Sequence, residues 1–195
     1  MARPRKFDET RVIGAVMDAF WRRGYEATST RDLSEGTGLG PSSLYNTFGD
    51  KRQLYLRALR RYYETATDAQ IEILERPGPV KDRLRELMLR DIGVGADTSG
   101  TGRPVGCFAI NAAIEMASSD PDVKEQVHRH FARVEEALKD TVARGQRAGE
   151  IRTDRDAAGL ARQVLSTYYG LHVLSRAHDD RRVIEDVVEG ALAAL

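Results

Sequence analysis

The stretch Ser29–Leu54 reads STRDLSEGTGLGPSSLYNTFGDKRQL. It predicts two short helices joined by a tight turn, followed by the start of a third helix, with the two-helix motif at about residues 29–48. Hydroxyl side chains at its beginning are good helix caps. We expect Gly36 and Gly38 to break the first helix. Pro41 suits the first turn of the second helix, because its missing N–H costs nothing there.

The second helix of this stretch has a polar outer face. Leu44 and Phe48 lie four residues apart and are expected to point inward. The outward side chains then carry hydroxyl and amide groups, which can bind phosphate oxygens and base edges when a helix lies in a DNA major groove. They are Ser42, Ser43, Tyr45 and Asn46. Lys51, in the first turn of the next helix, opposes the helix dipole and indicates a nearby anion. The alternative is a surface hairpin with a polar face.

The spacing R-D-L-x-x-x-x-G-L-x-x-x-x-L-Y-N-x-F-x-x-K-x-x-L resembles the signature of the tetracycline-repressor (TetR) family of helix-turn-helix regulators. The resemblance covers about residues 7–62. Its core L-Y-x-x-F-x-x-K begins at Leu44 and ends at Lys51. Gly36 and Asn46 depart from the residues usual in that family, which most often has alanine at the first position and histidine or an aromatic residue at the second.

The resemblance implies a ligand-responsive transcriptional regulator, most often a repressor. Such a protein binds a palindromic operator in double-stranded DNA as a homodimer and is released by a small molecule or an electrophile. The last two helices, at about residues 154–175 and 180–195, would form the dimer interface. A basic arm at residues 2–6 would follow the DNA backbone or minor groove, or else be a frayed terminus. The expected DNA contacts are Thr30, Arg31, Ser42, Ser43, Tyr45, Asn46, Thr47, Lys51, Arg3, Arg5 and Lys6.

Composition is compatible with this interpretation. The chain has 195 residues and no net charge, but residues 1–60 carry 11 Lys and Arg against 7 Asp and Glu, while the remainder carries 19 against 23. The positive charge therefore accompanies the motif. A single cysteine, Cys107, excludes an intrachain disulfide and fits a reducing cytoplasm. The absence of a run of about 18 apolar residues argues against a membrane span.

The whole chain is predicted to be all-α, with about nine helices and two domains. Residues 1–60 would form the three-helix DNA-binding domain, and residues 61–195 a helical bundle for ligand binding and dimerisation. A long helix at about residues 50–76 is expected to connect them. The glycine-rich stretch 93–106 is expected to be a surface loop that can act as a lid. A helix at about residues 107–118 is apolar on nearly all sides, which favours a central position.

The terminal helices carry unbroken apolar seams, which can be core or interface. Leu160, Val164, Tyr168 and Leu171 line the first, and Ile184 begins the second.

No catalytic, metal or cofactor site is predicted. His128 and His130 are two residues apart, so they point to different sides of a helix and chelate poorly. Cys107 stands at a probable helix start, where the dipole favours the thiolate. Its segment, Gly106–Phe108 with Asn111 and Glu115, is similar to that of TetR-like regulators that sense electrophiles or oxidants through cysteine. The alternative is a buried, inert thiol.

Four further residues are candidates for effector binding. Asn111 and Glu115 lie four apart on the apolar helix, so they can anchor a ligand, or they can bond each other or a neighbouring helix end. Tyr168 and His172 can line the same cavity or the dimer seam. Two other functions stay open: a helical small-molecule-binding protein without DNA-binding activity, and, less favoured, an enzyme that uses this cavity. The sequence does not distinguish repression from activation.

Overall fold

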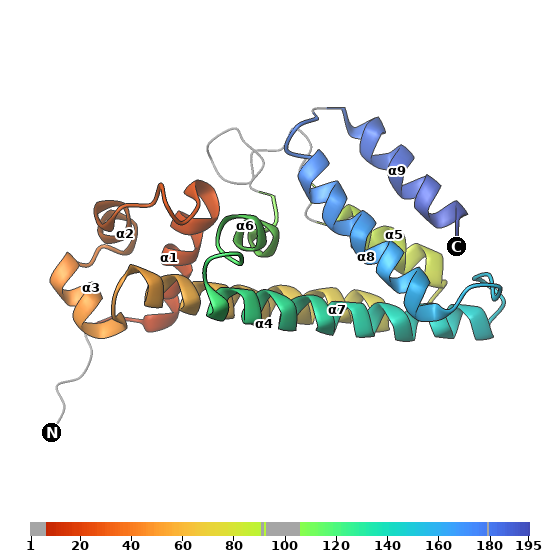
Figure 1. The fold of residues 1–195 in the computed structure, drawn as a ribbon, viewed down its shortest axis with the longest axis horizontal. Coiled ribbons are helices and arrows are strands. Elements are labelled where there is room, and N and C mark those ends of the chain that lie inside the picture. The colour runs from red at the N-terminus through yellow and green to blue at the C-terminus, as the bar shows by residue number, and fades with distance from the viewer. Residues whose placement is uncertain (1–6, 91, 93–105, 179) are drawn as a thin grey trace, which may run out of the picture.

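The computed structural model describes residues 7–90, 92, 106–178 and 180–195. These residues form nine α-helices and no strand, as the sequence predicts (Figure 1). No helix among them is long and apolar enough to cross a membrane. The basic arm and most of the expected lid lie outside the described residues. The helices are α1 (Glu9–Arg23), α2 (Thr30–Thr37), α3 (Pro41–Phe48), α4 (Lys51–Glu75), α5 (Val80–Leu89), α6 (Phe108–Glu115), α7 (Pro121–Arg147), α8 (Ala157–Leu174) and α9 (Arg181–Ala193).

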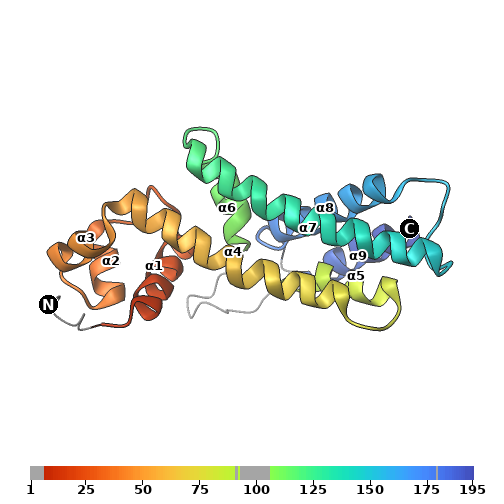
Figure 2. The same ribbon diagram turned by 90° about the horizontal axis from the view of Figure 1, so that it is seen from below.

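Helices α1, α2 and α3 pack with the beginning of α4 at one end of the molecule (Figures 1 and 2). The apolar residues on their inner faces are buried and belong to one core cluster; among them are Val16, Phe20, Leu33, Leu44 and Phe48. Burying each of these side chains stabilises the fold by about 1.5–3 kcal/mol. The predicted three-helix core is therefore present.

The expectation that Gly36 breaks the first motif helix is wrong. Helix α2 continues through Gly36 to Thr37 and ends at Gly38, which has the left-handed φ of 72°. A glycine inside a helix costs only about 1 kcal/mol relative to alanine. A left-handed residue is what closes a helix. Of Gly36 and Gly38, only Gly38 has a left-handed φ.

Helix α4 is the element shared by both halves of the molecule. It begins at the Asp50 cap, whose carboxylate accepts from the Gln53 N–H at 2.8 Å. Its first half belongs to the core cluster of α1–α3, whereas Ile73 and Leu74 belong to a second cluster. At about 1.5 Å per residue, its 25 residues span roughly 37 Å. The predicted long connecting helix is confirmed.

The second core cluster joins the far part of α4 to α5, α7, α8 and α9. Leu160, Val164, Tyr168 and Leu171 of α8, and Ile184 of α9, are buried within it. The apolar seams of the two terminal helices are therefore core of this chain, which was one of the two expectations for them.

Helix α6 lies between the two ends of the molecule (Figure 1). Phe108 and Ala109 are buried in the same cluster as α1–α3, which agrees with the expected central position. The helix is shorter than expected, because it ends at Glu115 rather than at Ser118.

Candidate functional site

The start of α2 is held by local hydrogen bonds. The Ser29 hydroxyl accepts from the Asp32 N–H at 3.2 Å, and the Asp32 carboxylate accepts from the Ser29 N–H at 2.8 Å. This reciprocal capping box satisfies two donors at the start of α2. Pro41 occupies the first turn of α3 as expected. The start of α2 is thus fixed by its own hydrogen bonds before any partner binds.

The outer face of α3 carries exposed polar side chains. Ser42, Ser43 and Asn46 are exposed, while Leu44 and Phe48 on the opposite face are fully buried. Thr47 is half-buried, and its hydroxyl donates to the Ser43 carbonyl at 2.9 Å. Exposed hydroxyl and amide groups on a rigid short helix can form hydrogen bonds with base edges and phosphates.

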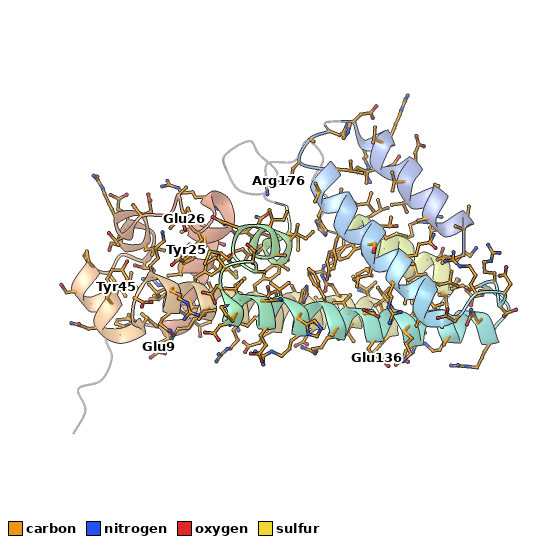
Figure 3. The ribbon with its side chains drawn as sticks, viewed as in Figure 1. Glu9, Tyr25, Glu26, Tyr45, Glu136 and Arg176 are labelled. Atoms are coloured by element: carbon orange, nitrogen blue, oxygen red, sulfur yellow. The ribbon has the colours of Figure 1, made fainter. Side chains whose placement is uncertain are left out.

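Tyr45 does not face outward as expected. Its ring is half-buried against the core cluster, and its hydroxyl oxygen is shielded from solvent (Figure 3). Burial, and to a smaller degree the charge of Asp50, raises the pKa of Tyr45. A phenol is too large to point away from the three-helix core without exposing apolar ring surface. The Tyr45 ring therefore helps to hold α3 against the three-helix core.

Lys51 has partners within the protein. Its ammonium group donates to the Glu26 carbonyl at 3.4 Å and lies 4.5 Å from the centre of the Tyr25 ring. These two contacts place a positive charge beside the start of α4, next to α3. Both contacts are with uncharged groups, a carbonyl oxygen and a ring face, rather than with the nearby anion that the position of Lys51 indicated. The half-buried side chain keeps part of its surface open.

The other predicted DNA contacts lie around α2. Thr30 and Arg31 are both exposed in its first turn. The Arg31 guanidinium donates to the Glu35 carboxylate at 2.7 Å, an exposed i,i+4 pair that a phosphate can replace at small cost. Arg3, Arg5 and Lys6 lie outside the described residues.

Helix α6 is attached directly to the DNA-binding end, a feature that sequence reasoning missed. The two Glu115 carboxylate oxygens accept from the consecutive N–H groups of Tyr25 and Glu26 at 2.8 and 2.9 Å. These three residues are the Glu115 latch. At the other end of α6, the Trp21 indole donates to the Gly106 carbonyl at 3.0 Å. A lone carboxylate on an apolar helix was the only signal available, and it did not identify partners some 90 residues away.

A charged contact connects the start of α4 to the start of α7. The Arg52 guanidinium donates to both oxygens of Asp120 at 2.6 and 2.9 Å, and to Asp122 at 2.6 Å. The carboxylates raise the pKa of Arg52, and the guanidinium lowers the pKa of Asp120. Because Asp120 also caps α7, the ion pair fixes where α7 begins relative to the DNA-binding end.

The five predicted effector residues fall into separate groups. Cys107 is the N-cap of α6, only 3 % exposed, with its sulfur 3.3 Å from the Tyr62 hydroxyl. The side-chain oxygen of Asn111 accepts a hydrogen bond from the Arg176 guanidinium, beyond the end of α8, at 2.7 Å. Glu115 is the latch residue, and it bonds the backbone of the loop between α1 and α2 rather than Asn111.

Tyr168 and His172 lie together on α8, both buried, with ring centres 4.8 Å apart. The Gln70 amide of α4 donates to the Tyr168 hydroxyl at 2.9 Å. Of the five predicted residues, Tyr168 and His172 are therefore in contact with each other.

A column of aromatic rings connects these groups across the molecule. It starts at Trp21 in α1 and continues through α4, α7 and α8, with neighbouring ring centres 4.7–6.4 Å apart. Rings at such separations are in contact. Its members are Trp21, Tyr62, Tyr63, His130, Tyr169, Tyr168 and His172.

At its centre, His130 is buried, whereas its neighbour His128 is exposed, in agreement with their expected opposite orientations. Burial, with a smaller effect of Arg133, lowers the pKa of His130 to about 4. The ring is therefore neutral at physiological pH.

Comparison with known proteins gives two family matches. Residues 12–58 match the model described as "Bacterial regulatory proteins, tetR family", and residues 97–191 match "Tetracyclin repressor-like, C-terminal domain". Among curated proteins, the chain is 32% identical to the HTH-type transcriptional regulator YezE of Bacillus subtilis, with all of both chains covered. It is 28% identical to the HTH-type transcriptional repressor ComR of Escherichia coli, over 89% of this chain and 82% of that one.

Among solved structures, the chain is similar to a cysteine mutant of the regulator CifR complexed with a 26-base-pair double-strand operator DNA. The TM-score is 0.83, with 27% identity and 99% of both chains covered.

Proposed function

The chain belongs to the TetR family of helix-turn-helix transcriptional regulators, and we propose that it acts as a repressor which binds a palindromic operator as a homodimer and is released by a small effector. The observation that carries this proposal is the exposed polar face of α3, backed by a buried apolar face. The likeness to an operator-bound regulator supports it. We place the protein in the cytoplasm with its DNA and assign it no catalytic role.

The dimer interface is proposed on the outer faces of α8 and α9. The inner faces are used by the core of this chain, so the partner must contact the opposite side. On α8 this side presents Ser166, Gly170 and Val173, which are exposed and spaced one helical turn apart. Val173 is 50 % exposed, a large fraction for a valine on a helix. Small residues here allow two helices to approach closely.

The effector is proposed to act through α4 and α6. Both helices touch the DNA-binding end, and both share the core with the C-terminal helices. A ligand that fits only one arrangement of these helices changes the distance between the two α3 helices of a dimer. To release the operator effectively, it must favour that arrangement by about 3–5 kcal/mol.

Two kinds of effector compete within this proposal. One reacts with the Cys107 thiol, and the other binds reversibly among the buried aromatic rings. Burial of the Cys107 sulfur favours a reversibly bound effector. Its position at the start of α6 favours an effector that reacts with the thiol. Once an inducer is identified, Cys107→Ser is expected to abolish the response to an electrophile. An unchanged dose response in that variant contradicts the thiol mechanism.

Selection from a random pool of DNA duplexes tests the proposed function. The proposal predicts enrichment of an inverted repeat whose half-site centres lie about one helical turn or more apart, roughly 34–36 Å per turn. Size-exclusion chromatography with light scattering should give a dimer. Enrichment of no sequence, or of an asymmetric single site by a monomeric protein, contradicts the proposal.

A further inference from the structure

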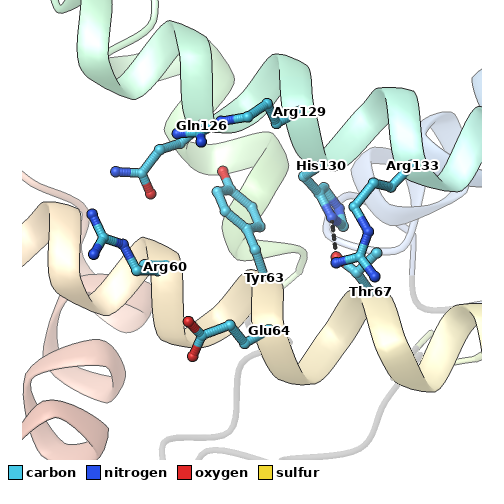
Figure 4. Close-up of a pocket in the computed structure, with 8 residues that line it drawn as sticks. All are labelled: Arg60, Tyr63, Glu64, Thr67, Gln126, Arg129, His130 and Arg133. Carbon is cyan, nitrogen blue, oxygen red and sulfur yellow. Dashed lines mark hydrogen bonds between the residues drawn. The ribbon is translucent and has the colours of Figure 1, made fainter.

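A surface groove lies between α4 and α7, on the central part of both helices (Figure 4). Its volume is about 280 Å³. We call it the α4–α7 groove, and it is separate from the exposed face of α3. Residues from both helices line it: Arg60, Tyr63, Glu64 and Thr67 from α4, and Gln126, Arg129, His130 and Arg133 from α7.

The floor of the groove contains two buried polar atoms that lack a hydrogen-bond partner among the described residues. They are the Tyr63 hydroxyl oxygen and the Gln126 side-chain oxygen. Each of these residues is only 8 % exposed. Leaving such atoms unpaired is unfavourable, so a molecule that bonds to them in the groove gains free energy.

Aromatic and neutral side chains complete the floor. The Tyr63 and His130 rings stack with centres 4.7 Å apart. His130 is fixed from below by Thr67, whose hydroxyl lies 2.7 Å from Nδ1. Because burial keeps His130 neutral, the floor carries no charge of its own. It therefore suits a flat organic group better than a hydrated ion.

The rim of the groove is positively charged. Three arginines surround it, against one carboxylate, Glu64. Arg133 is held by Asp68 at 3.0 Å, and Arg129 is 3.7 Å from Glu125. Arg60 has no ion pair within the described part of the chain and is exposed. One guanidinium is thus free and a second is loosely paired, which matches a ligand with a single negative charge.

We propose that the α4–α7 groove binds a small aromatic carboxylate that carries a second polar group. The carboxylate lies between Arg60 and Arg129, the ring lies over Tyr63, and the polar group bonds the Tyr63 hydroxyl and the Gln126 amide. The groove is slightly smaller than the roughly 300–1,000 Å³ usual for ligand sites, so one ring fits better than two. Glu64 disfavours a dianion such as a phosphate ester.

The position of the groove gives binding a consequence, which rests on the proposed function. The ligand would bridge α4, which enters the DNA-binding end, and α7, whose start is fixed to α4 through Arg52. Filling the groove separates or draws together these helices beyond that fixed point. The binding event itself requires no DNA, so it can be measured independently of operator recognition.

Isothermal titration calorimetry of the full chain with 4-hydroxybenzoate tests the site. Its methyl ester has the same ring and hydroxyl but no charge, so we expect it to bind at least about tenfold more weakly. Arg60→Gln should weaken the binding of 4-hydroxybenzoate by a similar factor. Arg147→Gln, an exposed arginine on the same α7 but outside the groove, should leave the affinity unchanged.

Tyr63→Phe removes a single oxygen that has no partner among the described residues, so the melting temperature of the variant should not fall while its affinity for 4-hydroxybenzoate does. Equal affinity for the ester, no effect of Arg60→Gln, or no saturable binding in the millimolar range overturns the site. The same titrations keep the two proposals apart. If the protein binds the carboxylate but selects no operator, the binding site stands and the proposed regulatory function is rejected. If it selects an operator but does not bind the carboxylate, only the binding site is rejected.

Discussion

At the scale of single residues, His130 shows how a buried polar side chain is accommodated. Its Nδ1 lies 2.7 Å from the Thr67 hydroxyl and its Nε2 lies 3.4 Å from the Tyr169 hydroxyl. Each hydroxyl can donate or accept, so a neutral imidazole is satisfied on both sides. A protonated ring would place a charge among aromatic side chains, with Arg133 nearby.

The lowered pKa of His130 predicts acid sensitivity. In the unfolded chain the group titrates near its ordinary pKa of 6.5, and in the folded protein at about 4. Between these values the unfolded state binds more protons, so the free energy of unfolding falls as the pH falls. From pH 6.5 to about pH 5 the loss should be about 2 kcal/mol. Urea denaturation at several pH values measures it.

The control for this prediction is His130→Gln, which keeps a polar group but does not titrate. Most carboxylates ionise below about pH 5, so they contribute little to the difference in this range. The variant should show a flatter dependence of stability on pH than the natural chain. Identical slopes for the two proteins would contradict a buried, neutral His130.

At the scale of elements, α6 is held between the two ends of the molecule. The Glu115 latch and the Trp21 bond attach it to the DNA-binding end, and Asn111 attaches it to Arg176 beyond α8 (Figure 3 labels Tyr25, Glu26 and Arg176). A short helix with both sides fixed transmits displacement of α8 to the loop before α2. The latch is thus a positioning contact for the helix-turn-helix.

Removing the latch should release that loop. Glu115→Ala leaves two backbone N–H groups without acceptors, which should lower the free energy of unfolding by about 1–3 kcal/mol. It should also abolish the hydrogen-exchange protection of the Tyr25 and Glu26 amides. Glu136→Ala is the matched control, because within the part of the chain that the structure describes this exposed glutamate pairs only with Lys139 on α7.

If the Tyr25 and Glu26 amides exchange equally fast in the natural chain and in Glu115→Ala, the latch does not exist in solution.

The sequence was sufficient to predict the elements themselves, because their signals are local. Caps at Asp8 and Asp50, and the apolar spacing of Leu44 and Phe48, determine where helices begin and which faces are buried. The predicted helix end at Gly36 was wrong, because a single glycine resembles a helix stop signal although a helix can contain one at a small cost in stability. The latch and the Arg52 ion pair could not be predicted, because they join residues about 70–90 positions apart.

Tyr45 illustrates the same limit in the candidate DNA-binding face. Helical spacing placed it on the outside, but the size of its ring brings it against the core. Periodicity assigns a direction to a side chain and gives no information on how far a large ring folds back. By contrast, Ser42, Ser43 and Asn46 are short, so their direction alone determined their exposure.

At the scale of the whole molecule, α4 joins the DNA-binding end to the helical bundle, and α8 and α9 lie at the far end from α3 (Figures 1 and 2). A second copy bound across α8 and α9 would therefore leave both α3 helices free to contact DNA. Because α4 is continuous between the two ends, a displacement of its far half in the bundle can change the separation of these helices.

The most direct measurement is fluorescence anisotropy of the purified protein on DNA from just upstream of its own gene, over a series of salt concentrations. The account predicts sequence-selective binding that falls steeply with salt. Asn46→Ala should lose selectivity by about 1–3 kcal/mol, and Lys51→Ala should weaken binding to all sequences. Arg147→Gln should change neither. Binding to this DNA and to a selected pool no tighter than to random duplex would contradict the account.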